Sequence, residues 1–230
     1  MGIRVGVICP DRSDRPKFME MFYRQLDRQT LKPERVEVVD YVPESFSCDI
    51  TQRYRRGYDI LRGKDLDVIL FMENDDVYAP TYIEVMAENW LKYGKPKMLG
   101  LNYTIYYHLF IGKSFVFKHE KRSSAMSTLI RPDMDFEWCA DSYAYTDSHL
   151  WKTVGGVTFN PRKDIALGLK HGLSMTGGLW HRDNLERYKE TNIDFKKLVG
   201  ESDYAFYRSL YPPTARLERD KAKGLHLVGL

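Results

Sequence analysis

The chain has 230 residues, 43% of them hydrophobic and 29% charged, which is ordinary for a globular protein with one well-buried domain. Its net charge of +3 is too small to indicate a nucleic-acid binder, although it is compatible with a polyanionic ligand. No apolar run could span a bilayer, no secretory pattern opens the chain, and the three cysteines lack zinc-site spacing, so we expect a cytoplasmic protein without a transmembrane segment.

The first half of the chain alternates strand and helix patterns. Ile3–Cys9 is apolar and β-branched like a buried strand, and the polar loop 10–16 separates it from an amphipathic helix over Lys17–Gln29. The elements that follow are a strand at Val36–Val39, a helix at Thr51–Arg62, a strand at Val68–Met72 and a helix at Pro80–Tyr93. Such βαβ units predict an α/β fold, with a mostly parallel sheet covered by helices.

The second half is rich in aromatic and β-branched residues. Met98–Lys118 predicts strands with a hairpin at Gly112 and Lys113, and Ser124–Ile130 predicts another strand. Helices are expected over 176–188 and 202–210, with a loop or tail from Tyr211. Because no linker interrupts the sequence, we expect a single domain over residues 1–230.

Polar residues follow each of the first three predicted strands. The strands end at Asp11 and Arg12, at Asp40, and at the run Glu73–Asp76. Ligands of an open parallel sheet bind beyond the carboxyl ends of its strands, and core packing requires no charges there. We therefore predict a binding site at this edge.

The strongest local signal is the stretch ILFMENDD, which ends in Glu73, Asn74, Asp75 and Asp76. Its three carboxylates repel one another, and a divalent cation would relieve that repulsion. Hard oxygen ligands suit Mg²⁺ or Mn²⁺, and a metal held there could clamp a diphosphate leaving group. The alternative is a solvated acidic turn in which Asp76 caps the next helix.

Several motifs of residues 1–95 stand in a recognisable order. They are the loop Pro10–Pro16, Gln29-Thr30 at a helix end, VEVVD ending at Asp40, an Arg-rich helix, and Glu73–Asp76 followed by Ala79-Pro80-Thr81-Tyr82. This order resembles the GT-A glycosyltransferases, especially their large inverting family of nucleotide-sugar transferases. The resemblance implies a GT-A (Rossmann-like) fold, with a nucleotide-sugar-binding half at 1–97 and an acceptor-binding and catalytic half at 98–230.

Two later segments extend the resemblance. MTGGLWHRDNLERY (175–188) is similar to the family's Gly-Gly-Arg segment, and GESDYAFYRSL (200–210) to its Glu-Asp motif. This implies Asp203 as general base with Glu201 as the alternative, although Ser202 between them departs from the family pattern. The stretch YTDSHLW (145–151) is also similar to a Glu-Asp-x-x-Leu-Trp pattern, which makes Asp147 a further candidate. No Gly-Gly-Arg segment precedes Asp147, so it ranks lower.

The resemblance also implies roles for the other candidate residues. Donor contacts are expected from Pro10, Asp11, Arg12, Asp40, Arg53, Asn74 and Asp75. Metal ligands are expected from Asp75, Glu73, Asp76 and His226, and acceptor-side contacts from Trp180, His181 and Arg182. Some of these candidates have a structural alternative. Asp40 could cap a turn, Arg12, Arg15 and His226 could be surface residues, Asp203 could be a helix N-terminal acid, and Trp180 could be a core residue.

The sequence thus predicts an inverting, Mn²⁺- or Mg²⁺-dependent glycosyltransferase. It would move a sugar from a UDP- or GDP-linked donor to a hydroxyl of a glycan, a lipid-linked sugar or a modified DNA base. One alternative is a nucleotidyltransferase of similar fold, although the loop 10–16 lacks the glycines such enzymes use. Another is a non-catalytic nucleotide-sugar-binding module, which the departures at Glu73 and Ser202 suggest.

Overall fold

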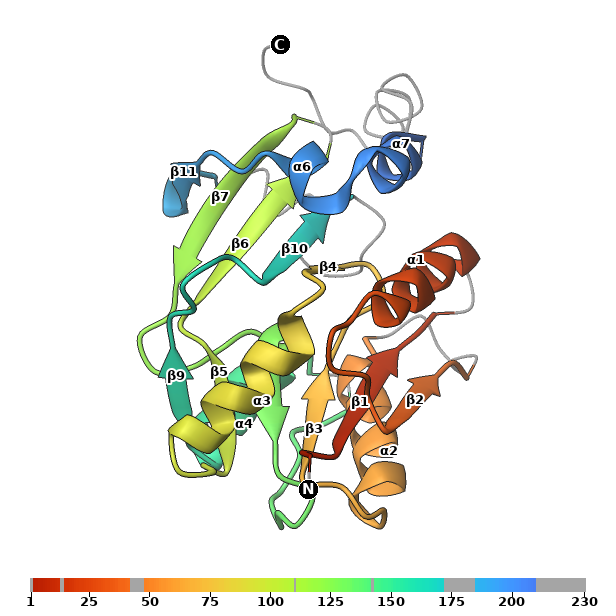
Figure 1. The fold of residues 1–230 in the computed structure, drawn as a ribbon. Coiled ribbons are helices and arrows are strands. Elements are labelled where there is room, and N and C mark those ends of the chain that lie inside the picture. Colours follow the sequence, from red (N-terminus) through yellow and green to blue (C-terminus); the bar gives the residue numbers. More distant parts are fainter. Residues whose placement is uncertain are drawn as a thin grey trace.

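The computed structural model describes residues 2–12, 15–41, 48–109, 111–141, 143–171 and 185–209 (Figure 1). The first half contains β1 (Val5–Pro10), α1 (Pro16–Asp27), β2 (Arg35–Val39), α2 (Ile50–Arg62), β3 (Val68–Phe71), β4 (Val77–Tyr78), α3 (Tyr82–Lys92) and β5 (Met98–Leu101). The rest contains β6 (Tyr103–His108), β7 (Lys113–Lys118), η1 (Ala125–Ser127), β8 (Thr128–Ile130), α4 (Thr146–Thr153), β9 (Val157–Phe159), β10 (Ala166–Lys170), η2 (Leu185–Arg187), β11 (Lys189–Thr191), α6 (Phe195–Val199) and α7 (Glu201–Ser209).

A six-stranded sheet of order β2-β1-β3-β8-β5-β9 forms the centre of the first half. Only β8 runs antiparallel to its neighbours in this sheet. Alternate residues of β1 face opposite sides: Val7 packs with α1 and α3, whereas Ile8 packs with α2 and α4. Burial on both faces explains why the inner strands β1 and β3 are apolar, whereas the edge strand β2 also carries Arg35 and Glu37. The predicted α/β fold, with a mostly parallel sheet between helices, is confirmed.

A second sheet of order β11-β7-β6-β10-β4 stands beside the first (Figure 1). Strand β4 follows β3 after a turn of five residues, 72–76, so the acidic run lies at the junction of the two sheets. Tyr107 of β6 stacks on Phe195 of α6 at 4.2 Å between ring centroids. Phe18 of α1 and Tyr207 of α7 belong to the same apolar cluster, so α1 contributes to the cores of both sheets.

Some predicted elements differ from the observed ones. The strand expected over Ser124–Ile130 begins only at Thr128, because the 3-10 helix η1, which starts after Ser124, comes first. The Thr128 hydroxyl donates to the backbone carbonyl of Ser124 at 2.8 Å, and such local bonds favour turns over strands. Of the expected helix at 176–188, residues 176–184 lie outside the described part, η2 occupies Leu185–Arg187 near its end, and β11 follows from Lys189. The expected hairpin is confirmed by β6 and β7, with Gly112 at φ +62° in its turn.

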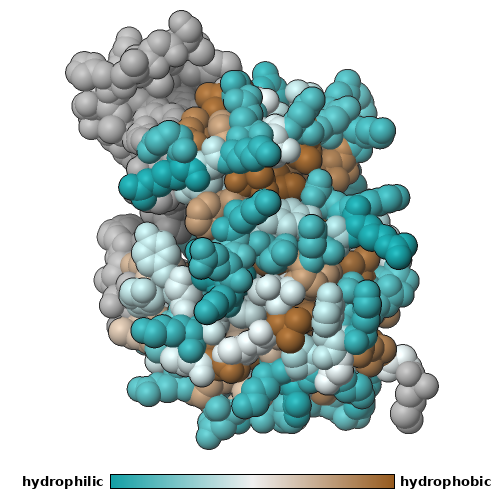
Figure 2. Space-filling view, turned by 90° about the vertical axis from the view of Figure 1, so that its left-hand side faces the viewer, coloured by the Kyte–Doolittle hydropathy of each residue, from teal (hydrophilic) through white to brown (hydrophobic). Residues whose placement is uncertain are grey.

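Hydrophilic side chains predominate on the face seen in Figure 2, and the hydrophobic ones form small separate patches. Among the described helices none has the length and apolar character needed to cross a bilayer. The core clusters therefore account for most of the large apolar side chains that the structure describes.

Candidate active site

A cavity of about 600 Å³ opens where the carboxyl ends of β1 and β3 meet the second sheet. Its lining includes Pro10, Arg12, Arg15, Arg53, Glu73, Asp75, Asp76, Tyr106, Phe117, Arg122, Thr146, Asp147, Lys170 and Tyr188. Residues far apart in the sequence therefore converge on the edge at which the sheet topology places ligands. The cavity is concave, partly aromatic and rich in charges, as a site for a charged organic ligand requires.

Three carboxylates lie together on the floor of this cavity. Glu73, Asp75 and Asp76 each offer a ligand atom within 4.8 Å of the others. Burial, reinforced by the charge of Asp75, raises the pKa of Glu73 to about 7. Burial also raises the pKa of Asp76. The cluster is thus electrostatically unfavourable by itself, and a bound cation would stabilise it.

Each of these carboxylates is held by a neighbour on another element. The Tyr54 hydroxyl donates to Glu73 at 2.9 Å, and the Leu169 backbone N–H donates to Asp76 at 2.9 Å. The accepting atom is Oε1 in Glu73 and Oδ1 in Asp76. Each carboxylate therefore keeps a second oxygen, and this all-oxygen donor set fits Mg²⁺ or Mn²⁺.

Asp75 lies between two cationic or polar partners. Arg15 Nη1 lies 2.6 Å and His171 Nε2 lies 2.9 Å from Asp75 Oδ2. Burial alone would raise the pKa of Asp75, but Arg15 and His171 outweigh it, so this pKa is lowered. Asp75 is therefore the carboxylate of the cluster that carries its charge most readily.

His171 and Tyr54 are site residues that sequence reasoning missed. His171 is completely buried, packs against the Phe18 ring at 4.6 Å, and follows directly after β10. The rule that polar residues at strand ends mark a site would have identified it. The short segment 166–170 shows no clear strand pattern in the sequence, so nothing local marks His171 as a strand-end residue.

Asn74 and Asp11 form a buried pair behind the cavity. The Asn74 amide donates to Asp11 Oδ1 at 2.5 Å, and Arg15 Nη2 lies 3.4 Å from the Asn74 oxygen. Burial raises the pKa of Asp11, with a smaller contribution from Asp40. Asp40 itself is exposed at the end of β2, and neither it, Asp11 nor Asn74 is in the described cavity lining. Their contacts with a donor stay predictions.

Arg53 lines the cavity, but its guanidinium donates its hydrogen bonds to other groups of the protein. It donates to the Asp49 carboxylate and to the backbone carbonyls of Asp11, Val39 and Tyr41. These bonds use every N–H group of the guanidinium. The side chain is only 1% exposed, so it joins the ends of β1 and β2 to α2 and shapes the cavity wall.

Arg53→Met is expected to lower the free energy of unfolding by about 3–5 kcal/mol. It removes the cation of a largely buried ion pair and leaves the Asp49 carboxylate without its counter-charge. Urea denaturation measures this change. Arg56→Met is the control. Both guanidinium groups lie over the Tyr41 ring, 4.2 Å from its centroid, but Arg56 is exposed, so its replacement should cost under about 1 kcal/mol. Equal stability of Arg53→Met and wild type would show that these bonds are dispensable.

Asp147 stands in the first turn of α4 and lines the same cavity. Arg122 Nη1 lies 2.6 Å from its Oδ2. Burial raises the pKa of Asp147 although Arg122 opposes this effect. Glu73 and Asp147 line the same cavity, and the charge of Asp147 makes a small contribution to the raised pKa of Glu73.

Asp203 occupies a different environment on α7. Arg24 of α1 and Arg28, which directly follows α1, each lie 2.6 Å from one of its carboxylate oxygens, and its side chain is 2% exposed. Neither Asp203 nor Glu201 is among the described cavity-lining residues, and the exposed Glu201 pairs with Lys196. The contacts of Asp203 are those of a residue that joins α7 to α1.

The expected acceptor-side residues Trp180, His181 and Arg182, and the expected metal ligand His226, lie outside the described residues.

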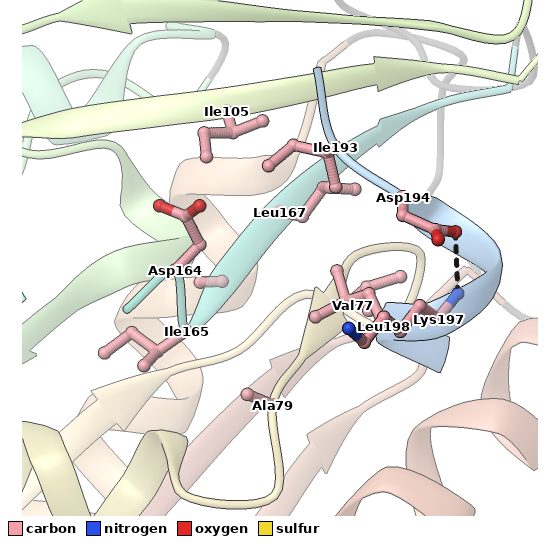
Figure 3. Close-up of a pocket in the computed structure, with 11 residues that line it drawn as sticks. Val77, Ala79, Ile105, Asp164, Ile165, Leu167, Ile193, Asp194, Lys197 and Leu198 are labelled. Carbon is pink, nitrogen blue, oxygen red and sulfur yellow. Dashed lines mark hydrogen bonds between the residues drawn. The ribbon is translucent and has the colours of Figure 1, made fainter. Parts of the chain in front are cut away.

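A smaller cavity of about 370 Å³ lies between β4, β6, β10 and α6 (Figure 3). Its wall is mainly aliphatic, with Val77, Ile105, Leu167, Ile193 and Leu198 turned toward it. The Asp194 carboxylate there caps α6 by accepting from the Lys197 backbone N–H at 3.0 Å. Its other acidic residue, Asp164, accepts from the Tyr103 hydroxyl at 2.7 Å, so both carboxylates already serve the fold and this cavity offers less chemistry than the larger one.

No protein-family model matches the chain, and no significant match was found among curated proteins. Among solved structures, S. aureus TarS 1–349 in complex with UDP-GlcNAc is similar, with a TM-score of 0.47 and 14% identity over 75% of this chain. The chain spans 60% of the length of that TarS structure. A197 from STIV is also similar, with a TM-score of 0.39 and 13% identity, over 76% of this chain and 99% of that one.

Proposed function

We propose that the chain is a metal-dependent glycosyltransferase that moves a sugar from a nucleoside-diphosphate donor to an acceptor hydroxyl. One observation carries the proposal: the acidic cluster Glu73, Asp75 and Asp76 shares one cavity with a separate carboxylate, Asp147, whose side chain is 15% exposed. Transfer of a sugar from a nucleoside diphosphate requires a cation to stabilise the diphosphate as it leaves. It also requires a group that accepts the proton of the acceptor hydroxyl. The motif order of residues 1–95 supports the same assignment.

The donor diphosphate would bind at the acidic cluster. Glu73, Asp75 and Asp76 would hold Mg²⁺ or Mn²⁺, which when bound supplies positive charge to the diphosphate and stabilises it as a leaving group. Arg15 and Lys170 line the same part of the cavity and add positive charge. Arg12 and Pro10, at the end of β1, would lie toward the nucleoside, and Arg53 would fix the wall they belong to.

Asp147 would act as the general base. It would accept the proton of the acceptor hydroxyl while that oxygen attacks the anomeric carbon and the bond to the diphosphate breaks. Its raised pKa favours this role, because a base works best when its pKa approaches the operating pH. A single displacement of this kind inverts the anomeric configuration. Asp203 remains the alternative that the motif resemblance offers.

The proposal predicts that Mn²⁺ together with UDP or GDP raises the melting temperature of the chain. At about one hundred times the dissociation constant, ligand binding contributes about 2.7 kcal/mol, which is a rise of roughly 5–10 °C for a domain of this size. Thermal-shift measurements with UDP, GDP, ADP and CDP, each with and without Mn²⁺, test this. The matched controls are the nucleoside monophosphates, which lack the second phosphate. No shift with any diphosphate in Mn²⁺ or Mg²⁺ would refute the proposal.

A further inference from the structure

Arg15 places a positive charge inside the acidic cluster. It immediately precedes α1, and its guanidinium contacts both Asp75 Oδ2 at 2.6 Å and the Asn74 side-chain oxygen at 3.4 Å. The two side chains of the Arg15–Asp75 pair are only 11% and 10% exposed. The guanidinium also lies over the Phe18 ring, 5.5 Å from its centroid. This is a packed, largely desolvated ion pair rather than a loose surface contact.

A divalent cation and Arg15 cannot both occupy the neighbourhood of Asp75 without cost. Asp75 Oδ2 already accepts from Arg15 and His171. A metal bound by Glu73, Asp75 and Asp76 would lie close to the guanidinium and be repelled by it. Entry of the metal without another anion would break the 2.6 Å ion pair between the guanidinium and Asp75 and leave the two cations repelling each other, so Arg15 opposes it.

A nucleoside diphosphate changes this balance. Its phosphate oxygens can accept two parallel N–H bonds from a guanidinium, a geometry that arginine fits better than lysine. Arg15 lines the cavity beside the acidic cluster, so a short rotation of its side chain would bring it from the carboxylate to the diphosphate. The same movement would free Asp75 for the metal.

We propose that Arg15 is the resident counter-cation of the acidic cluster and is exchanged for the metal only when a diphosphate is present. The inference rests on the proposed function and adds to it a linkage between the two ligands. Because linkage is reciprocal, the diphosphate should tighten metal binding by the same factor as the metal tightens diphosphate binding. Coupling of this kind is typically about 5- to 150-fold.

Arg15→Gln tests the proposal, with Mn²⁺ binding followed by electron paramagnetic resonance and UDP or GDP binding by calorimetry. Without nucleotide, the variant should bind Mn²⁺ about tenfold more tightly than the wild type, because the competing cation is gone. With saturating Mn²⁺, it should bind the diphosphate about tenfold more weakly. A residue that merely supports Asp75 would weaken both ligands, so opposite changes identify the exchange.

Two further variants separate the effect of the charge at position 15 from that of the paired donors. Arg15→Lys retains the charge without the paired donors, so its affinity for Mn²⁺ alone should match the wild type while diphosphate binding weakens. Lys17→Gln makes the same charge change at an exposed position two residues away and should alter neither affinity. Thermal melting of each variant without ligand confirms that it is folded.

Two kinds of result contradict the inference. If the wild type binds Mn²⁺ and nucleotide but Arg15→Gln leaves the affinity for Mn²⁺ alone unchanged or reduced, the exchange is wrong and the proposed function stands. If the wild type binds neither Mn²⁺ nor any nucleoside diphosphate, the proposed function fails and the inference falls with it.

Discussion

Replacing Asp75 by Asn is expected to abolish Mn²⁺-dependent binding of the donor and to lower its turnover by about a thousandfold or more. A metal in this role supplies several kcal/mol of charge stabilisation, and each 1.36 kcal/mol is about a factor of ten in rate. Asp75 is the cluster member whose pKa is lowered, so it contributes the most dependable negative charge. Turnover is measured as release of nucleoside diphosphate from a nucleotide sugar, with water in place of the acceptor.

The control for this variant is Asp65→Asn. Asp65 precedes the opposite end of β3 and its side chain is 86% exposed, so the same charge change there should leave turnover within about twofold. Asp75→Asn also leaves Arg15 without its carboxylate, which costs stability, so both variants are compared at temperatures well below their melting points. Wild-type turnover by Asp75→Asn would eliminate the acidic cluster as the donor site.

Asp147→Asn is expected to reduce turnover by about a hundredfold to ten-thousandfold while leaving Mn²⁺ and nucleotide affinity unchanged. The amide keeps the shape of the side chain but cannot accept the acceptor's proton. The matched variant is Asp203→Asn, which should instead lower the free energy of unfolding by about 2 kcal/mol through loss of the ion pairs with Arg24 and Arg28, with turnover little changed. The reverse pattern would assign the base to Asp203.

The same base predicts a pH dependence. Protonated Asp147 cannot accept a proton, so turnover should fall about tenfold per pH unit as the pH drops below its pKa. Because burial raises that pKa, the fall should begin at a higher pH than the ordinary value of about 3.9 for an aspartate. Arg122→Gln removes the charge that holds this pKa down, so it should move the acidic limb to still higher pH. If the acidic fall in turnover occurred at the same pH in Arg122→Gln as in the wild type, the assignment of Asp147 as the base would be contradicted.

Much of the fold follows from local patterns in the sequence. The apolar runs at β1 and β3 and the amphipathic pattern of α1 predict their elements, because each pattern reflects burial on a fixed face. Short elements were missed. Strand β4 has two residues and β9 has three, and neither is long enough to show a period.

The sequence by itself determined that a group of carboxylates ends the third strand, because those residues are contiguous and a buried strand must stop where the charges begin. Only the tertiary structure decided what surrounds them. Arg15 and His171 reach Asp75 from positions 60 and 96 residues away, brought there by the pairing of β1 with β3 and of β10 with β4. It likewise placed Asp147 in the cavity and Asp203 against α1. Sheet pairing and helix packing set such distances, and no local pattern encodes them.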